Sequence, residues 1–202
     1  MIRFGRYPAP IEWQVLERRA DRVLVVSRHI LDCRRYHDLP TATTWRDSTL
    51  RRWLNTTFLD AAFTAAEQRR IRRTRCTDNG HGTPDTVDRV FLLSVAQVRA
   101  LTHPGEGEGL DRRAVATSHA TARTPDGCHL YVYDKGVAKD YVDVDGERRG
   151  CSWWWLRTQP QAKGGTCARA AFVGARGDVK SYGAVDQRRC GVRPALLLDV
   201  SR

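Results

Sequence analysis

The chain has 202 residues, of which 41% are hydrophobic, and carries a formal net charge of +11 at pH 7. This length and composition suit a single domain, residues 1–202, with its own hydrophobic core. No apolar run reaches the ~18 residues of a membrane-spanning helix, and no apolar signal segment follows Met1. We therefore expect a cytoplasmic protein without a membrane span, or one carried on a phage or exported without a signal peptide.

Arginine dominates the positive charge, because only four of the 34 basic residues are lysines. Many arginines stand in adjacent pairs scattered along the chain, which is typical of solvated surface positions. A basic face can also bind nucleic acid or another polyanion. The composition therefore leaves polyanion binding open as an alternative function.

Two strands are predicted near the start of the chain. Residues 11–16 alternate apolar and polar side chains for most of their length, and residues 22–27 are more continuously apolar. This pattern indicates an antiparallel hairpin around the polar turn 18–21. Residues 195–198 are apolar without a break, so we expect a central strand there that pairs with this hairpin.

Three short helices are predicted between these strands, each marked by an N-cap residue. Asp47 or Ser48 suits the N-cap of an amphipathic helix. Thr64 and Ser94 each stand three residues before a Glu or Gln, which is a capping-box pattern. The other elements predicted in this half are helices over 64–73 and 94–101, a strand at 89–93, and loops at 77–85 and 103–109.

The second half of the chain shows no helical periodicity. It predicts short strands joined by Gly-containing turns, at 129–133, 138–144, 153–156, 171–173, 179–185 and 192–200. The whole pattern predicts an α+β fold, in which the N-terminal hairpin and short helices precede short antiparallel strands with long loops.

Three consecutive tryptophans stand near the middle of the second half. In a strand, Trp153 and Trp155 share one face and Trp154 takes the other, so both faces must be covered. We expect Trp153 and Trp155 in the core. Arg157 and Arg193 each lie inside an apolar segment, which predicts internal side chains bonded to carboxylates or loop carbonyls.

The stretch 159–190 lies between the tryptophan segment and the apolar segment 191–196. It is polar and rich in Gly, Ala and Arg, which predicts a mostly coil segment with little core content. Irregular segments mounted on a rigid scaffold commonly carry binding sites. We therefore expect the binding surface of the protein in this stretch.

The six cysteines include no Cys-x-x-Cys pair, which disfavours a structural zinc site, and without a secretory signal we expect reduced thiols. No cofactor is predicted, although calcium binding stays open because acidic residues gather in a basic chain. These residues also fit the tip of a hairpin. They are Asp134, Asp140, Asp143, Asp145 and Glu147.

Six segments of the chain resemble the bacterial domain of unknown function 6273 family. They follow in order over nearly the whole chain: Phe4–Tyr7, Pro10–Leu16, Trp45–Asn55, Asp88–Ser94, Trp154–Arg157 and Gly191–Ala195. The resemblance implies a branch of the C-type-lectin-like fold related to formylglycine-generating enzymes. Some members of that branch are variable proteins of diversity-generating retroelements, in which an error-prone reverse transcriptase rewrites surface codons near the C-terminus.

The resemblance implies a ligand-binding or display protein rather than an enzyme, with a binding face in residues 157–190. Its ligand would be an unknown protein or glycan. The stretch is rich in Ala, Arg and Gly, whereas diversified segments are rich in Asn, Tyr, Ser and Asp, so a fixed relative is the alternative. The ligand-binding side chains are expected at Trp154, Gln159, Phe172, Gly174, Arg176, Lys180, Tyr182, Asp186, Gln187 and Arg188.

An oxidase is the least favoured function. Formylglycine-generating enzymes use a cysteine pair near the C-terminus, and Cys167 and Cys190 invite the comparison. The sequence around both cysteines does not match the active-site segment of that family. No catalytic residue and no metal ligand is therefore assigned.

Overall fold

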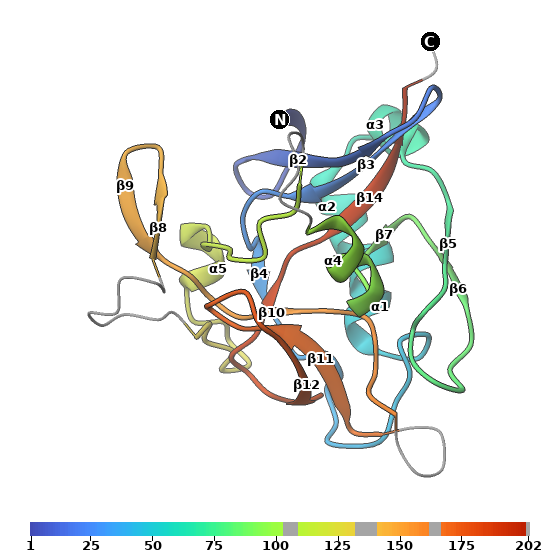
Figure 1. Ribbon diagram of the computed structural model, residues 1–202, viewed down its shortest axis with the longest axis vertical. Helices are drawn as coiled ribbons and strands as arrows, with labels where there is room; N and C mark the ends of the chain where they lie inside the picture. Colours follow the sequence, from blue (N-terminus) through green and yellow to red (C-terminus); the bar gives the residue numbers. More distant parts are fainter. Residues whose placement is uncertain (103–108, 132–140, 162–166, 201–202) are drawn as a thin grey trace.

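Two five-stranded sheets form the framework of the protein, in a computed structural model that describes residues 1–102, 109–131, 141–161 and 167–200 (Figure 1). The strands of the first sheet are, in order across it, β1 (Ile2–Arg6), β2 (Pro10–Arg18), β3 (Arg22–Ser27), β14 (Ala195–Asp199) and β7 (Val90–Phe91). Those of the second are β12 (Val179–Ala184), β11 (Arg169–Val173), β10 (Trp154–Trp155), β13 (Gly191–Val192) and β4 (Asp32–Cys33). Two further hairpins are β5 (Thr74–Cys76) with β6 (Thr86–Asp88), and β8 (Tyr141–Val144) with β9 (Glu147–Gly150).

Short helices connect the strands. They are α1 (Thr49–Trp53), the π-helix η1 (Leu54–Phe58), α2 (Leu59–Ala62), α3 (Ala65–Arg70), α4 (Val95–Leu101) and α5 (Ser118–Thr121). None of the helices in the described ranges is long and apolar enough to cross a membrane. Most strand pairs are antiparallel, and β10 runs parallel to β13. The α+β class predicted from the sequence is confirmed.

The locally encoded elements are confirmed. β2 and β3 form the expected hairpin, with Val15 opposite Val25, and β14 pairs with β3 over its whole length. The Ser48 hydroxyl accepts a hydrogen bond from the Arg51 amide at 3.2 Å, which caps α1. Both capping boxes are present, at Thr64 and at Ser94.

Several elements differ from the prediction. The helix predicted over 64–73 ends at Arg70, because Ile71 is extended, buried and bridged to Leu198. Polar strands β5 and β6 form a hairpin that the apolar pattern does not reveal, and β1 is broken by a register shift between Arg3 and Arg6. Helix α5 interrupts the second half, where only strands were predicted.

Residues 129–131 form no strand, although strand 129–133 was predicted. The amides of His129 and Tyr131 donate to the carbonyls of Arg188 and Arg189, at 2.8 and 3.0 Å. These bonds attach the segment to the chain after β12 without a continuous ladder. The rest of that predicted strand, the beginning of the strand at 138–144 and most of the loop 103–109 lie outside the described residues.

The segment Trp45–Asn55 is fixed to the end of β6 and the start of β7. The buried carboxylate of Asp88 accepts from the indole of Trp45 at 3.0 Å and from Arg51 Nε at 2.7 Å. The Asn55 amide oxygen accepts from the Arg89 amide at 2.8 Å, and its nitrogen donates to the Val90 carbonyl at 2.8 Å. Asp88 and Asn55, each with two or more hydrogen bonds, therefore connect the short helices to β6 and to β7 of the first sheet.

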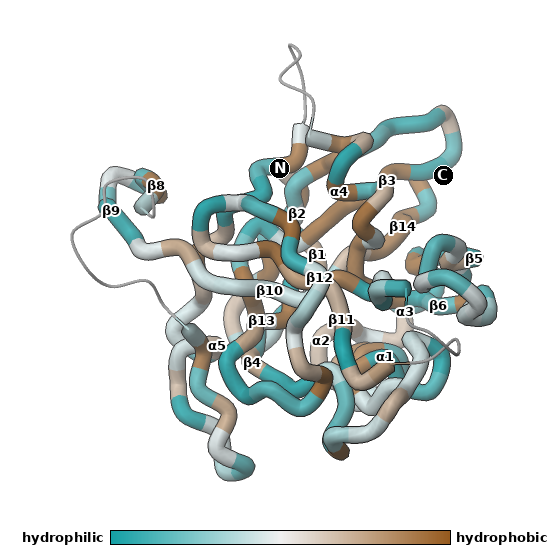
Figure 2. Tube along the Cα trace, turned by 60° about the horizontal axis from the view of Figure 1, so that its bottom comes forward, coloured by the Kyte–Doolittle hydropathy of each residue, from teal (hydrophilic) through white to brown (hydrophobic). Residues whose placement is uncertain are grey.

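Both faces of the tryptophan strand are covered. Trp155 and Trp153 contact the ring of Phe172 on one face, with centroids 6.2 and 5.4 Å away. On the other face the guanidinium of Arg193 lies 5.1 Å from the Trp154 ring. Trp154 and Trp155 are fully buried, whereas Trp153 remains half-buried. Apolar segments also follow β3 and β14 through the centre of the molecule (Figure 2).

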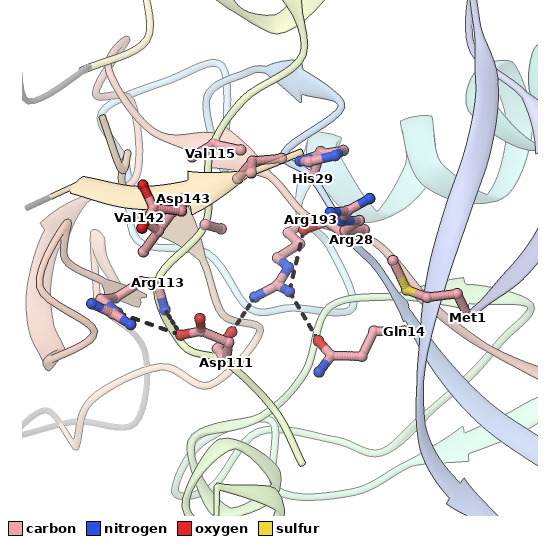
Figure 3. Close-up of a pocket in the computed structure, with 12 residues that line it drawn as sticks. Met1, Gln14, Arg28, His29, Asp111, Arg113, Val115, Val142, Asp143 and Arg193 are labelled. Atoms are coloured by element: carbon pink, nitrogen blue, oxygen red, sulfur yellow. Dashed lines mark hydrogen bonds and ion pairs between the residues drawn. The ribbon is translucent and has the colours of Figure 1, made fainter. Parts of the chain in front are cut away.

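Arg193 is internal, as predicted, and it bonds to backbone carbonyl and side-chain amide oxygens rather than to carboxylates. Its side chain is buried and donates to the carbonyls of Ser27 at 2.8 Å and Asp111 at 2.7 Å. A longer bond of 3.4 Å reaches the Gln14 side chain (Figure 3). Burial lowers the pKa of this guanidinium to about 10. It therefore stays charged at neutral pH.

Arg157 follows the same pattern near the other end of the predicted binding stretch. It donates to the carbonyls of Leu92 and Thr77 at 2.7 and 2.8 Å, and to the side chains of Asn79 and Gln97 at 3.0 and 2.6 Å. Burial lowers its pKa as well. The two arginines thus fasten loops from the first half of the chain to the second sheet.

Removal of the Arg193 side chain is predicted to destabilise the whole protein. Arg193→Ala leaves buried carbonyls without donors, so the free energy of unfolding should fall by about 3 kcal/mol or more. Arg176 is exposed and Lys180 is half-exposed, so Arg176→Ala and Lys180→Ala should each change it by about 0.5 kcal/mol or less. Thermal and urea denaturation check this, and equal losses in all three variants would refute it.

A second prediction concerns Gly5, which has φ +71°. A Cβ at this position would lie 2.7 Å from the Ala62 carbonyl oxygen and 2.5 Å from the Phe63 ring. Gly82 has nearly the same φ, +70°, but open space around it. Gly82→Ala should therefore cost about 1 kcal/mol for the left-handed backbone alone, and Gly5→Ala about 3 kcal/mol because overpacking adds to it. Urea denaturation of the pair measures the difference, and equal costs would contradict the role of this contact.

Candidate ligand-binding site

The hairpin β11–β12 carries the site and lies at the opposite end of the molecule from the β2–β3 hairpin (Figure 1). Strand β11 is buried from Ala170 to Val173, whereas β12 is mostly exposed or half-exposed. A tight turn joins them, in which the Gly174 amide donates to the Asp178 carbonyl at 2.8 Å. One strand therefore holds the hairpin in the protein while the other faces solvent.

The strands predicted at 171–173 and 179–185 are present as β11 and β12, but the expectation of little core content in 159–190 is wrong, because Ala170–Val173, Val185 and Cys190 are buried. Residues 169–173 and 179–184 form an antiparallel pair with one register shift between Ala170 and Phe172. Ala and Gly give the first strand and its partner a flat, closely packed surface: a Cβ on Gly183 would lie 2.8 Å from Trp155 and 2.9 Å from Phe172. Small residues therefore permit close packing here rather than marking a loop.

A hollow of about 240 Å³ opens beside the turn, and we call it the aromatic hollow. Four aromatic rings form a continuous row in it. Tyr131 stacks on Trp153 with centroids 4.2 Å apart, and Trp153 contacts Phe172 at 5.4 Å. Phe172 meets Tyr182 edge-on at 5.7 Å. The lining residues are Tyr131, Trp153, Phe172, Gly174, Ala175, Arg176, Asp178, Lys180 and Tyr182.

Charged side chains border these rings. Lys180 forms an ion pair with Asp178, whose hydrogen bond raises the pKa of the lysine. Arg176 is exposed and adds a second cation beside a single carboxylate. Tyr182 is the large hydrophobic side chain that the hairpin leaves most accessible, at 56% exposure. The aromatic hollow thus combines exposed aromatic faces with a positive border.

The structure brings together five of the ten residues predicted to bind ligand. These five line the aromatic hollow: Phe172, Gly174, Arg176, Lys180 and Tyr182. Phe172 is only 3% exposed and forms the floor. Gly174 is also buried, and a Cβ there would lie 2.6 Å from an Asp178 carboxylate oxygen. These two positions therefore shape the hollow, whereas the other three present side chains to solvent.

Trp154 and Gln159 are not surface residues, which corrects the sequence prediction. The Trp154 indole is fully buried and donates to the Arg112 carbonyl at 2.9 Å. Gln159 is 3% exposed, and its side-chain nitrogen donates to the carbonyls of Cys167 and Arg169 at 3.4 Å. Trp154 lies inside the protein on a strand between β11 and β13, and Gln159 is enclosed where its segment bridges to Gly80.

Asp186, Gln187 and Arg188 follow β12 and do not line the aromatic hollow. Arg188 is exposed, and one of its guanidinium nitrogens would lie 3.0 Å from a Cβ on Gly127. Gln187 is half-buried, and its side-chain nitrogen is enclosed next to Gly183. These three residues therefore belong to the neighbouring turn.

Two hollow-lining aromatics, Tyr131 and Trp153, were not among the predicted ligand-binding residues. Trp153 was expected in the core, and Tyr131 belonged to a predicted strand far from residues 157–190 in sequence. Alternation along the tryptophan run does place Trp153 beside Phe172. The stacking of Tyr131 on it comes from a long-range contact that no local pattern encodes.

A second hollow of about 240 Å³ lies between the β8–β9 hairpin and the ends of β2 and β3 (Figure 3). Its arginines already have partners. Arg28 pairs with Glu12 at 2.8 Å and with Asp145 at 3.1 Å, and Arg193 bonds to carbonyls as described above. This hollow therefore offers a ligand little unused charge.

The acidic residues considered for calcium are only partly described. Asp145 pairs with Arg28, whereas Asp143 and Glu147 lie exposed on the β8–β9 hairpin. Asp134 and Asp140 lie outside the described residues. Among the residues that are described, no three His, Cys, Asp or Glu side chains stand together as a metal site.

All six cysteines are free thiols. Cys190 is fully buried, and burial raises its pKa well above the ordinary value. The Cys167 thiol lies near the carbonyl of Arg169, at 3.3 Å. Neither thiol lines the aromatic hollow.

Comparison with known proteins supports the predicted family. No curated protein and no solved structure matches the chain significantly. The model of one family, Domain of unknown function (DUF6273), matches residues 20–200, which is most of the chain and includes the whole second sheet and strands β3, β7 and β14 of the first. The protein therefore belongs to the DUF6273 family, as its sequence segments predicted.

Proposed function

We propose that the protein is a ligand-binding module that recognises a protein or glycan through the aromatic hollow, and that it is not a catalyst. The observation that carries this proposal is the row of four rings, in which Phe172 and Tyr182 of the β11–β12 hairpin continue the stack of Tyr131 on Trp153, while the inner strand of the hairpin is buried. A fixed row of rings loses little conformational freedom when a ligand covers it, so contact area translates well into affinity.

The chemistry of the hollow favours a ligand with both an apolar face and an acidic or hydroxyl group. Tyr182 and Trp153 offer ring faces with a polar atom at the edge, which suits partly wet contacts. Arg176 and Lys180 stand beside them as cations. A sugar ring or an aromatic side chain next to a carboxylate meets both demands.

A C-type-lectin-like fold and the role of a variable protein are the specific form of this proposal. Two sheets, short helices and a C-terminal binding hairpin are compatible with them, and a fixed, undiversified module is the alternative. Buried arginines 157 and 193 would allow exposed side chains of β12 to change without loss of the fold, because their bonds hold the neighbouring segments independently.

The binding role predicts that small changes in the hollow abolish recognition. A glycan array and a displayed peptide library, screened with the purified protein, supply the probe. Tyr182→Ala and Lys180→Ala should each weaken binding of the selected probe at least tenfold, as for central interface residues. Arg169→Ala is the matched control, because Arg169 is exposed on the same hairpin but outside the hollow. Fluorescence polarisation measures the affinity of the wild type and of each variant for the selected probe.

Two outcomes would contradict this role. If both hollow variants bind the probe as tightly as the wild type does, the aromatic hollow is not the binding site. Equal weakening in Arg169→Ala, together with a steep fall in affinity as salt rises, would favour a diffuse polyanion-binding surface instead.

The variable-protein role predicts a genomic signature. A template repeat and a reverse-transcriptase gene should lie beside the coding sequence, with adenine-specific differences in codons for exposed positions such as Arg176, Lys180, Ser181 and Tyr182. The codons for Phe172 and buried glycines should be spared, since these residues shape the hairpin. Genome sequencing checks this, and a locus without a template repeat would contradict diversification.

A further inference from the structure

We propose that the protein has a second site, which binds a phosphate group between the segment after β4 and helices α1 and η1. A hollow of about 250 Å³ opens there, and we call it the arginine hollow. Three arginines, two threonines and a tryptophan supply its chemistry: Arg34, Arg35, Arg52, Thr49, Thr57 and Trp53. None of these residues lines the aromatic hollow.

Arg34 is held in place on the wall of the arginine hollow. The guanidinium carbon lies 4.0 Å from the centre of the Trp53 ring, and Nε donates to the Asp32 carboxylate at 3.3 Å. Asp32 also accepts from Tyr7 and from the Cys33 amide, each at 2.7 Å. Arg34 also has a side-chain hydrogen bond with Tyr7. Its side chain lines the arginine hollow, where its positive charge can meet an oxyanion.

Arg35 carries a charge that no carboxylate neutralises directly within the described chain. Its terminal nitrogens donate only to the carbonyls of Asp38 and Asp126, both at 3.3 Å. Its Nε is buried without a partner. Because carbonyl oxygens offset a guanidinium charge less than a carboxylate does, an anion in the hollow would stabilise this residue.

Arg52 projects from α1 as an exposed side chain that forms no hydrogen bond or ion pair with any described residue. The hydroxyls of Thr49 and Thr57 likewise have no partner there, and both line the hollow. The exposed Arg52 and the stacked Arg34 thus line the same hollow. An arginine fork matches the geometry of phosphate oxygens, and hydroxyls add shorter-range donors.

Two carboxylates, Asp38 and Asp126, also line the hollow and limit its charge. The Asp126 carboxylate forms hydrogen bonds within its own turn, where it accepts from the Thr124 hydroxyl and the Cys128 amide. The hydrogen bond from Thr124 lowers its pKa. With three cations and two anions the hollow keeps a positive balance, which suits one phosphate or pyrophosphate group better than a long polyanion.

Isothermal titration calorimetry with pyrophosphate tests the site, at constant ionic strength and in a buffer without phosphate. The wild-type protein should bind with a single saturable site. Arg52→Ala should weaken binding about tenfold, and Arg52→Lys less, because lysine retains the charge but not the fork. Arg69→Ala is the matched control, because Arg69 is an exposed helical arginine outside the hollow. Neither Arg52 nor Arg69 bonds to another described residue through its guanidinium, so both variants should fold.

A competition arm identifies the source of the phosphate. If a 20-nucleotide single-stranded DNA displaces pyrophosphate, and Arg52→Ala weakens both, the phosphate of a nucleic acid fits the site. If DNA does not displace pyrophosphate, a small phosphorylated molecule fits it. Absence of saturable pyrophosphate binding, or equal weakening by Arg52→Ala and Arg69→Ala, would overturn the proposal.

Discussion

Buried arginine side chains whose partners are carbonyl and amide oxygens from distant segments determine how this protein is held together. Arg157 and Arg193 each form several bonds to carbonyl or amide oxygens, and each spans segments more than sixty residues apart in sequence. A buried guanidinium without partners is very unfavourable, so these loops and the sheets must form together. The strands β10 and β13 next to them have only two residues each, too few to fix the chain through ladder hydrogen bonds alone.

This arrangement explains why a binding face can lie on β12. The inner strand β11 pairs with β10, and Phe172 and Trp155 fill the space behind the hairpin. The outer strand needs no side chain of its own to stay in register, since its backbone pairs with β11 and Gly183 approaches the tryptophan closely. Lys180 and Tyr182 therefore keep their contacts with Asp178 and Phe172 while facing solvent, and can serve recognition.

The sequence predicted best what local chemistry encodes. The β2–β3 hairpin follows from alternation, and the N-caps Ser48, Thr64 and Ser94 follow from side chains that bond three residues away. It also predicted internal arginines at 157 and 193, because each stands in an apolar segment. It failed where the decisive contact is distant. The stretch 159–190 was expected to add little to the core, but Gly183 lies close to Trp155 and Phe172 is buried. Tyr131 reaches the aromatic hollow only by stacking on Trp153. Burial at Trp154 and Gln159 likewise depends on neighbours remote in sequence.

The positive charge is less available than the composition suggests. Arg51 is paired with the buried Asp88, Arg72 with Asp21 and Asp199, and the two internal arginines are enclosed. Such residues cannot bind a polyanion without unfolding part of the protein. The arginines that can bind an anion are therefore those without an ion pair to a carboxylate. In the described chain, Arg35 and Arg52 meet that condition and line the same hollow. A net charge spread over the surface would give weak, salt-sensitive attraction, whereas two such arginines beside a fixed third one can select the shape of a single phosphate.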